Sequence, residues 1–171
     1  MKLAVFILFI SLNYQVADLI SQRKAQVLAI EQSLIAFKEL EYSYGDAEGI
    51  ITFYRDSTKT QMRILKENDS GSYGSSTSDY YSVDNKLIYL YRFELSWDGM
   101  APDDYSLTCT EYYFSDELTG QKTTHTLKTT SEELMKEDLI RLEAVKKDTI
   151  ALSVEDYHSL YRDFTYLLNQ E

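Results

Sequence analysis

The segment that most constrains the fold is residues 78–94, SDYYSVDNKLIYLYRFE, in which apolar and polar residues alternate around a short turn. Asp84 and Asn85 are residue types that favour tight turns, so they divide the segment into two strands. Successive side chains of a strand point to opposite faces of a sheet. One side of the second strand is therefore apolar along its length, and its members are Leu87, Tyr89, Tyr91, Phe93 and Leu95. This pattern predicts an antiparallel hairpin with one face on a hydrophobic core.

A weaker copy of this hairpin follows at residues 110–125, where Glu111-Tyr112-Tyr113 repeats the earlier Asp79-Tyr80-Tyr81. Further strand-like segments lie at residues 50–54, 60–65, 105–114 and 119–129. The chain holds 15 tyrosines, which suit half-buried strands because the ring packs while the hydroxyl stays wet. We expect an antiparallel meander of about five or six strands, near the common sheet size. It would occupy residues 45–129, with residues 66–78 as a loop or weak edge strand and residues 119–129 at the sheet edge.

Helical patterns flank the predicted sheet. In residues 18–44 apolar residues recur at spacings of three, four and seven, which predicts a helix from about Leu19 to about Leu40. Its polar face mixes both charges, which favours packing on the sheet over a partner-binding or membrane-lying role. Residues 130–171 predict two helices, one beginning at a capping box of Thr130 and Glu133 and one beginning at Ser153. Joined by residues 148–152, they should pack as a hairpin, so the predicted fold class is α+β.

The first 17 residues resemble a targeting segment in their composition. Lys2 precedes a ten-residue apolar run at residues 3–12, which is shorter than the roughly 20 residues of a membrane-spanning helix. Ala17 is a suitable residue before a cleavage point, so residues 1–17 predict a signal peptide, with an uncleaved N-terminal anchor as the alternative. No cysteine follows the run, which excludes a bacterial lipid anchor there. We expect residues 18–171 to form one secreted or periplasmic domain without stable membrane insertion.

Charge and cysteine content exclude several classes of function. The chain carries 28 acidic and 17 basic residues, a net charge of −11, which argues against binding to nucleic acid or to anionic membranes. Cys109 is the single cysteine, so neither an internal disulfide nor a cysteine zinc cluster can form. We expect Cys109 to be a small buried apolar residue instead of a nucleophile.

The two histidines do not point to a catalytic site. His158 lies near Asp156 and Asp163 in a predicted helix, which could suggest a general base. However, no motif places a serine or cysteine nucleophile beside it, so a surface position is the preferred interpretation. His125, in a polar strand, is interpreted in the same way. The sequence thus predicts no catalytic residue and no cofactor.

Two weak candidate sites stand out. Asp98, Asp103 and Asp104 place three carboxylates in one loop, and calcium binds such oxygens. Their spacing is not that of an EF-hand, and a plain turn uses the same residue types. The second candidate is an aromatic platform for a sugar or a peptide, provided that several rings face solvent. Its members would be Tyr80, Tyr89, Trp97 and Tyr112. Packing in the core is the alternative role of these rings.

The aromatic pair and turn of the hairpins resemble those of a class of small exported bacterial proteins of unknown function. The matching residues are Glu111-Tyr112-Tyr113-Phe114 and Asp84-Asn85-Lys86-Leu87-Ile88. The resemblance runs from residue 49 to about residue 118 and implies a periplasmic or secreted setting, without an activity. The second turn, Asp116-Glu117-Leu118, departs from the pattern because it lacks lysine and glycine.

Two function classes follow. The first is a non-catalytic binding or interaction module of the cell envelope or exterior, whose partner would be another envelope or extracellular protein. It would use an exposed sheet face, an edge strand or the acidic surface. The alternative is a hydrolase-type enzyme whose carboxylates converge only in the fold, because such pairs leave no local pattern. A structural role in the envelope is a third option. A cluster of exposed rings would favour binding, and a deep pocket with facing carboxylates would favour an enzyme.

Overall fold

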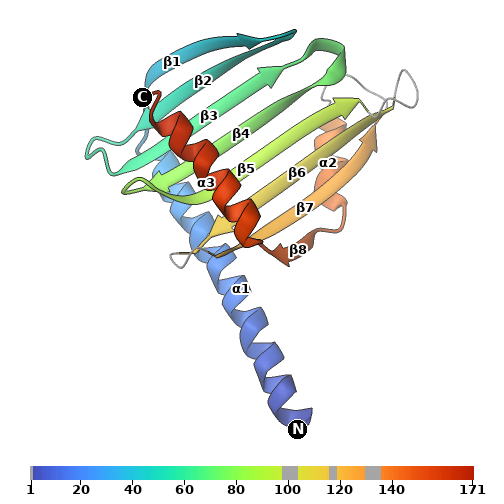
Figure 1. Ribbon diagram of the computed structural model, residues 1–171. Coiled ribbons are helices and arrows are strands. Elements are labelled where there is room, and N and C mark those ends of the chain that lie inside the picture. Colours follow the sequence, from blue (N-terminus) through green and yellow to red (C-terminus); the bar gives the residue numbers. More distant parts are fainter. Residues whose placement is uncertain (1, 98–103, 116–118, 130–135) are drawn as a thin grey trace.

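The computed structural model describes residues 2–97, 104–115, 119–129 and 136–171. One antiparallel sheet of eight strands, arranged in chain order, forms the centre of the molecule (Figure 1). The strands are β1 (Ile35–Tyr44), β2 (Ala47–Arg55), β3 (Gln61–Asp69), β4 (Gly74–Val83), β5 (Lys86–Trp97), β6 (Tyr105–Phe114), β7 (Gly120–Thr129) and β8 (Asp148–Ala151). The helices are α1 (Lys2–Glu31), the short 3-10 helix η1 (Gly71–Tyr73), α2 (Lys136–Ala144) and α3 (Val154–Leu168).

The α+β class, the antiparallel meander and the flanking helices are confirmed, but the predicted number of strands is wrong. One extra strand is β1, because the first helix ends at Glu31 and not near Leu40. Residues 35–44 combine helix-like spacings with an alternation that also suits a strand. These residues form a strand because they pair with β2, where Leu40 lies opposite Ile51.

The predicted loop and edge also differ from the structure. Most of residues 66–78 belong to β3 and β4, which pair across Lys66 and Ser78. Strand β7 is not at the edge, because Lys122 pairs with Ile150 of the short strand β8. The two edges of the sheet are therefore β1 and β8.

The C-terminal helices do not form a hairpin. Helix α3 crosses one face of the sheet, whereas α1 and α2 lie behind it, and β8 separates α2 from α3 in the chain (Figure 1). The predicted start of α3 is confirmed, because Ser153 Oγ accepts a hydrogen bond of 3.0 Å from the backbone N–H of Asp156. The predicted capping box at Thr130 and Glu133 lies outside the described residues.

A β-bulge in β5 distributes its apolar residues over both faces. Tyr81 pairs with Tyr89 and Ser82 pairs with Leu87, so Ile88 is an extra residue between the two pairs. Leu87 consequently packs in the core beneath α3, while Ile88 and Tyr89 pack on the α1 side. The expectation that Leu87 shares a face with Tyr89 is wrong for this reason.

The core on the α3 side is the largest of three hydrophobic cores among the described residues. Helix α3 buries one residue per turn, and these residues meet apolar side chains from β2 to β6. The helix contributes Tyr157, Leu160, Phe164 and Leu167. The sheet contributes Phe53, Ile64, Tyr80, Leu90, Tyr112 and Phe114, among others. The spacing of three and four in α3 is what directs all four helical side chains to the sheet.

The opposite face carries two smaller cores. Beneath α1, Ile30 packs against Tyr81, Tyr89 and Tyr113, whose rings lie next to one another. Beneath α2, Leu142 packs against a group that includes Leu107 and Cys109. Cys109 is buried, as the sequence predicts.

Helix α1 is continuous from Lys2 to Glu31 and includes the apolar run at residues 3–12. Its N-terminal half extends beyond the sheet (Figure 1). Among the described residues, no helix combines the length and the apolar character that a membrane crossing requires. Export, and cleavage after residue 17, stay predictions.

Candidate ligand-binding groove

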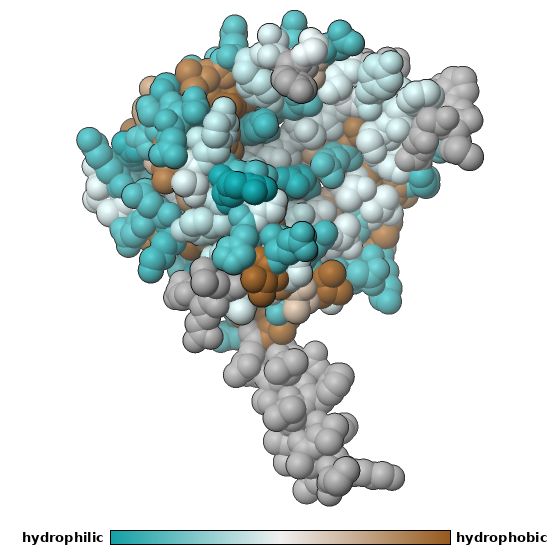
Figure 2. Space-filling model, viewed as in Figure 1, coloured by the Kyte–Doolittle hydropathy of each residue, from teal (hydrophilic) through white to brown (hydrophobic). Residues whose placement is uncertain are grey.

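The face of the sheet that carries α3 is only partly covered by that helix. Beside α3 lies an open groove of about 1080 Å³, whose floor is formed by the sheet and whose margins are formed by β1 and α3. The space-filling view from this side is mainly hydrophilic to intermediate in hydropathy (Figure 2). We call this region the α3 groove.

The floor of the α3 groove follows from the sequence of β4 and its neighbours. Every second residue of β4 faces the groove side, so Tyr80 lies under α3 while Ser78 and Ser76 continue the row into the open. The register places Lys66 and Arg92 on either side of Ser78. One row further from α3, Asn68 and Glu94 flank Ser76 in the same way.

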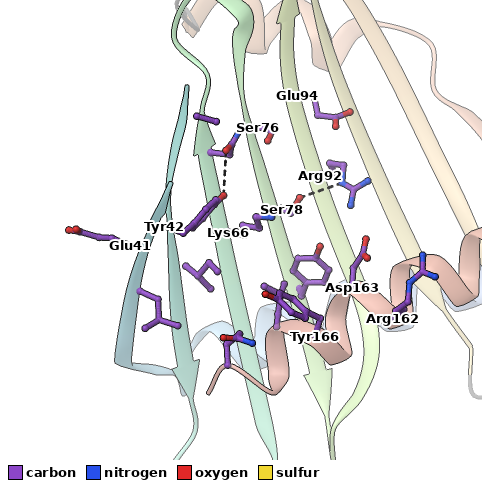
Figure 3. A pocket seen from close by; sticks show the side chains of 17 residues that line it. Glu41, Tyr42, Lys66, Ser76, Ser78, Arg92, Glu94, Arg162, Asp163 and Tyr166 are labelled. Atoms are coloured by element: carbon purple, nitrogen blue, oxygen red, sulfur yellow. Dashed lines mark hydrogen bonds between the residues drawn. The ribbon is translucent and has the colours of Figure 1, made fainter. Parts of the chain in front are cut away.

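Arg92 is the most distinctive residue of the floor. Its Nε donates a long hydrogen bond of 3.4 Å to Ser78 Oγ, and Ser78 is itself buried (Figure 3). The guanidinium is half-buried, yet it forms no ion pair with a carboxylate of the described residues. Burial raises the pKa of the neighbouring Tyr80 hydroxyl, and the positive charge of Arg92 acts against that rise. Arg92 can therefore offer further N–H donors to an anion.

Two aromatic rings stand at the margins of the groove. Tyr42 comes from β1, where its hydroxyl donates to the Glu67 carbonyl oxygen at 3.2 Å and Lys66 Nζ lies 5.3 Å from its ring centroid. Burial raises the pKa of Tyr42. Tyr166 comes from α3 and is 65% exposed. Figure 3 shows both rings at the groove, with the floor residues between them.

The charges of the groove are balanced, unlike those of the whole chain. Its lining includes the cations Lys66, Arg92 and Arg162 and the carboxylates Glu41, Glu94 and Asp163. All three carboxylate residues are exposed. Asp163 rises from α3, while Glu94 lies on the floor (Figure 3). The groove thus presents two half-buried cations, Lys66 and Arg92, with exposed carboxylates around them.

The four aromatic residues singled out from the sequence are not brought together. Tyr80 and Tyr112 are buried under α3, and Tyr89 is buried under α1 on the opposite face. Trp97 is 41% exposed at the end of β5, where its ring lies 6.2 Å from that of Tyr73.

The two rings of the groove, Tyr42 and Tyr166, were missed from the sequence. Tyr166 could have been found, because it lies off the apolar stripe of α3. Tyr42 could not, because it follows the predicted helix and the strand β1 that carries it was not predicted.

The remaining candidates lie away from the groove or outside the described residues. Asp98 and Asp103 of the predicted calcium loop are not described, and Asp104 precedes β6. In the described part of the chain, no three potential metal-ligating side chains come together. His158 is exposed on α3, as predicted. His125 instead is buried, with Nδ1 3.0 Å from the Leu142 carbonyl oxygen, because α2 covers this part of β7.

A second polar cluster lies on the α1 side, around Glu111. Tyr89 donates a hydrogen bond of 3.0 Å to Glu111 Oε1, Lys24 Nζ lies 3.2 Å from the same oxygen, and Lys147 Nζ lies 3.7 Å from Oε2. Burial alone would raise the pKa of Glu111, but the hydrogen bond from Tyr113 and the charge of Lys24 bring it below the ordinary value. Because Lys24 belongs to α1 and Lys147 precedes β8, this carboxylate ties both segments to the sheet.

An ion pair between the half-buried Arg63 and the buried Asp79 continues this cluster toward β3. Arg63 forms two hydrogen bonds to Asp79, of 2.7 and 2.8 Å. The Tyr81 hydroxyl lies 3.0 Å from Asp79 Oδ2 and 2.8 Å from Glu31 Oε1 at the end of α1. Burial raises the pKa of Asp79 in spite of the Arg63 charge. These contacts are satisfied within the protein, so we regard the cluster as structural and the α3 groove as the candidate site.

Comparison with known proteins gives no match. No family model, no curated protein and no solved structure is significantly similar to the chain.

Proposed function

We propose that the protein is a non-catalytic binding module of the cell envelope or exterior that holds its ligand in the α3 groove. The main support for this proposal is the environment of Arg92. It is a half-buried cation at the floor of a large groove, and its hydrogen-bond partners are neutral hydroxyl groups. Taking a charge out of water is costly unless a partner compensates. A bound ligand with a negative or strongly polar group would supply that partner.

The size and shape of the groove support a ligand that inserts a group between sheet and helix. Pockets for small ligands commonly enclose about 300–1,000 Å³, and the α3 groove, at about 1080 Å³, is slightly larger than that range. It could hold a small molecule or one segment of a longer chain. A protein or polymer of the envelope would bind by placing such a segment in it.

The hydrolase alternative is favoured by one feature of the same groove. Glu94 and Asp163 approach it from the sheet and from α3, as paired carboxylates of a hydrolase would (Figure 3). Both are exposed, whereas a general acid usually owes its raised pKa to burial. Binding without chemistry is therefore the better-supported role. The variant Glu94→Gln separates the two roles, because it would abolish hydrolysis and leave binding by Arg92 in place.

The cellular setting in this proposal comes from residues 1–17. Their charged start and short apolar run favour export. The partner we expect is another protein or polymer of the envelope or exterior. Recovery of the mature N-terminus from the medium or envelope would support export, and recovery of intact residues 1–17 from the cytoplasm would contradict it.

Affinity capture with a blocked groove tests the proposed function. The tagged protein is incubated with its native envelope and medium, and bound material is identified by mass spectrometry. Ser76→Trp fills the groove floor with a large ring. The control Thr126→Trp adds the same ring to β7 on the same face, outside the groove. The proposal expects a ligand that the wild type and Thr126→Trp retain and Ser76→Trp loses. Equal capture by all three proteins, or capture by none, would contradict it.

A further inference from the structure

We infer that the ligand of the α3 groove is a saccharide that carries one carboxylate, and that Arg92 binds this carboxylate. The inference rests on the proposed function and specifies its ligand. It follows from three properties of the groove, namely the free donors of Arg92, the chemistry of the floor, and the charge around the site.

The first property is the geometry of the arginine. Arginine presents five N–H donors in a planar fork that matches the two oxygens of a carboxylate. The Nε of Arg92 is directed to Ser78 Oγ at 3.4 Å, which holds the guanidinium against the floor. The guanidinium is also hydrogen-bonded to the Tyr80 hydroxyl. No carboxylate of the described residues pairs with it, so it keeps N–H donors for a ligand. A ligand carboxylate in this position would form two charge-assisted hydrogen bonds.

The second property distinguishes a saccharide from a peptide. Extended peptides are often recognised by adding a strand to a free sheet edge, through backbone hydrogen bonds. The floor of the groove lies in β3, β4 and β5, each of which is paired on both sides. Their backbone groups are thus engaged within the sheet. What the floor offers instead are the hydroxyls of Ser76 and Ser78 and the amide of Asn68.

Such side chains both donate and accept hydrogen bonds, as sugar hydroxyls do. The rings at the margins complete the match, because aromatic faces pack against the C–H face of a sugar ring. Tyr166 is exposed, and Tyr42 is held in place by the Glu67 carbonyl and by Lys66. A peptide would instead place apolar side chains in apolar subsites. Leu40, Ile51 and Leu167 also line the groove, so the peptide in the panel below tests this alternative directly.

The third property limits the charge of the ligand. The protein carries a net charge of −11, and three carboxylates line the groove beside the cations. A polyanion would be repelled by this field over many ångströms. A ligand with a single carboxylate next to Arg92 would be attracted by the guanidinium and would be repelled less by the surrounding carboxylates than a polyanion. We therefore expect acidic oligosaccharides of low charge density to bind in preference to sulfated or polyuronate chains.

The test uses titration calorimetry with matched saccharides. The panel contains disaccharides or trisaccharides with one glucuronic, galacturonic or N-acetylneuraminic acid, each beside its methyl ester, and a peptide of similar size with one glutamate. The ester keeps the sugar and removes the charge. Hydrogen bonds to charged groups contribute about 1.5–3 kcal/mol, so at least one acid should bind about 10- to 100-fold more tightly than its ester.

Variants of the protein show which residue causes the preference for the acid over the ester. Arg92→Gln should bring the acid and ester affinities together, and Arg92→Lys should retain part of the difference because it keeps the charge without the fork. Asp163→Asn should strengthen binding of the acid. The control Arg141→Gln makes the same change of charge on an exposed residue of α2 and should have no effect. Each variant is first compared with the wild type by circular dichroism and thermal unfolding.

The outcomes separate this inference from the proposed function. Equal binding of acid and ester, binding of the peptide alone, or no binding of any saccharide at millimolar concentration would overturn the inference. If Ser76→Trp nevertheless loses a captured ligand, the groove is a binding site for another class of ligand. If Ser76→Trp loses nothing, the proposed function fails as well.

Discussion

Glu111 illustrates how a single buried carboxylate can hold several elements together. Its carboxylate accepts a hydrogen bond from the Tyr89 hydroxyl and lies close to Lys24 and Lys147, so its negative charge is compensated at both oxygens. We predict that Glu111→Gln lowers the free energy of unfolding by about 1–3 kcal/mol, because hydrogen bonds to a charged group are replaced by weaker ones. Urea unfolding at neutral pH measures this loss. The control Glu39→Gln, on an exposed residue of β1, should change stability by less than about 0.5 kcal/mol.

The same carboxylate predicts a pH dependence. The pKa of Glu111 in the folded protein lies below its ordinary value, so the ionised form favours folding. Its contribution is complete above the ordinary glutamate pKa and is lost as the pH falls through the lowered pKa of the folded state. The stability difference between wild type and Glu111→Gln should therefore be full at pH 7 and should shrink in acid. A difference that grows in acid would show that burial, and not the lysines, dominates this site.

Single residues also show what sequence reasoning could reach. Burial of Cys109, exposure of His158 and capping by Ser153 follow from residue type and local pattern, and all three were predicted. The environment of Arg92 was not predicted, because it depends on the register in which β4 and β5 pair. The strand pairing that places Ser78 beside it and leaves it without a carboxylate is a property of β4 and β5 together. A strand sequence alone says which face a residue is on, but not which residue lies opposite.

Among the elements, α1 is attached to the sheet through a small apolar contact. Ile30 is 1% exposed within the layer of Tyr81, Tyr89 and Tyr113, whereas Leu28 of the same helix is 62% exposed. We predict that Ile30→Ala costs about 2–4 kcal/mol, since it leaves a cavity between helix and sheet. Leu28→Ala should cost less than about 0.5 kcal/mol. Chemical unfolding compares the two variants, and equal losses would show that α1 does not dock as described.

The elements that were mispredicted share a physical cause. Residues 35–44 carry apolar residues at spacings that fit either a helix or a strand, and the deciding contribution is the pairing of β1 with β2. Strand β8 is only four residues long, and it forms because β7 offers a free edge to it. In both cases the partner, and not the local preference, selects the structure. The long central strands were predicted because their alternation continues over many residues.

The whole molecule has a fold that should not depend on residues 1–17. The first α1 residue described in contact with the sheet cores is Leu19, and the anchoring Lys24 and Ile30 follow it. We predict that the chain from Asp18 onward keeps cooperative unfolding, with a free energy within about 1 kcal/mol of the full chain. A chain from Gln32 onward, which lacks both anchors, should expose the tyrosine layer and bind a hydrophobic dye. Loss of cooperativity already in the longer chain would contradict this.

NMR chemical-shift mapping shows directly whether an acidic saccharide binds in the α3 groove of the folded protein. An isotope-labelled chain from Asp18 onward is titrated with sialyllactose, a saccharide with one carboxylate, while amide chemical shifts are followed by NMR. We predict shifts concentrated in β3, β4, β5 and α3, around Lys66, Ser78 and Arg92. Shifts confined to the β1 edge, to the Tyr73 and Trp97 pair or to the α1 face, or none at millimolar ligand, would contradict it.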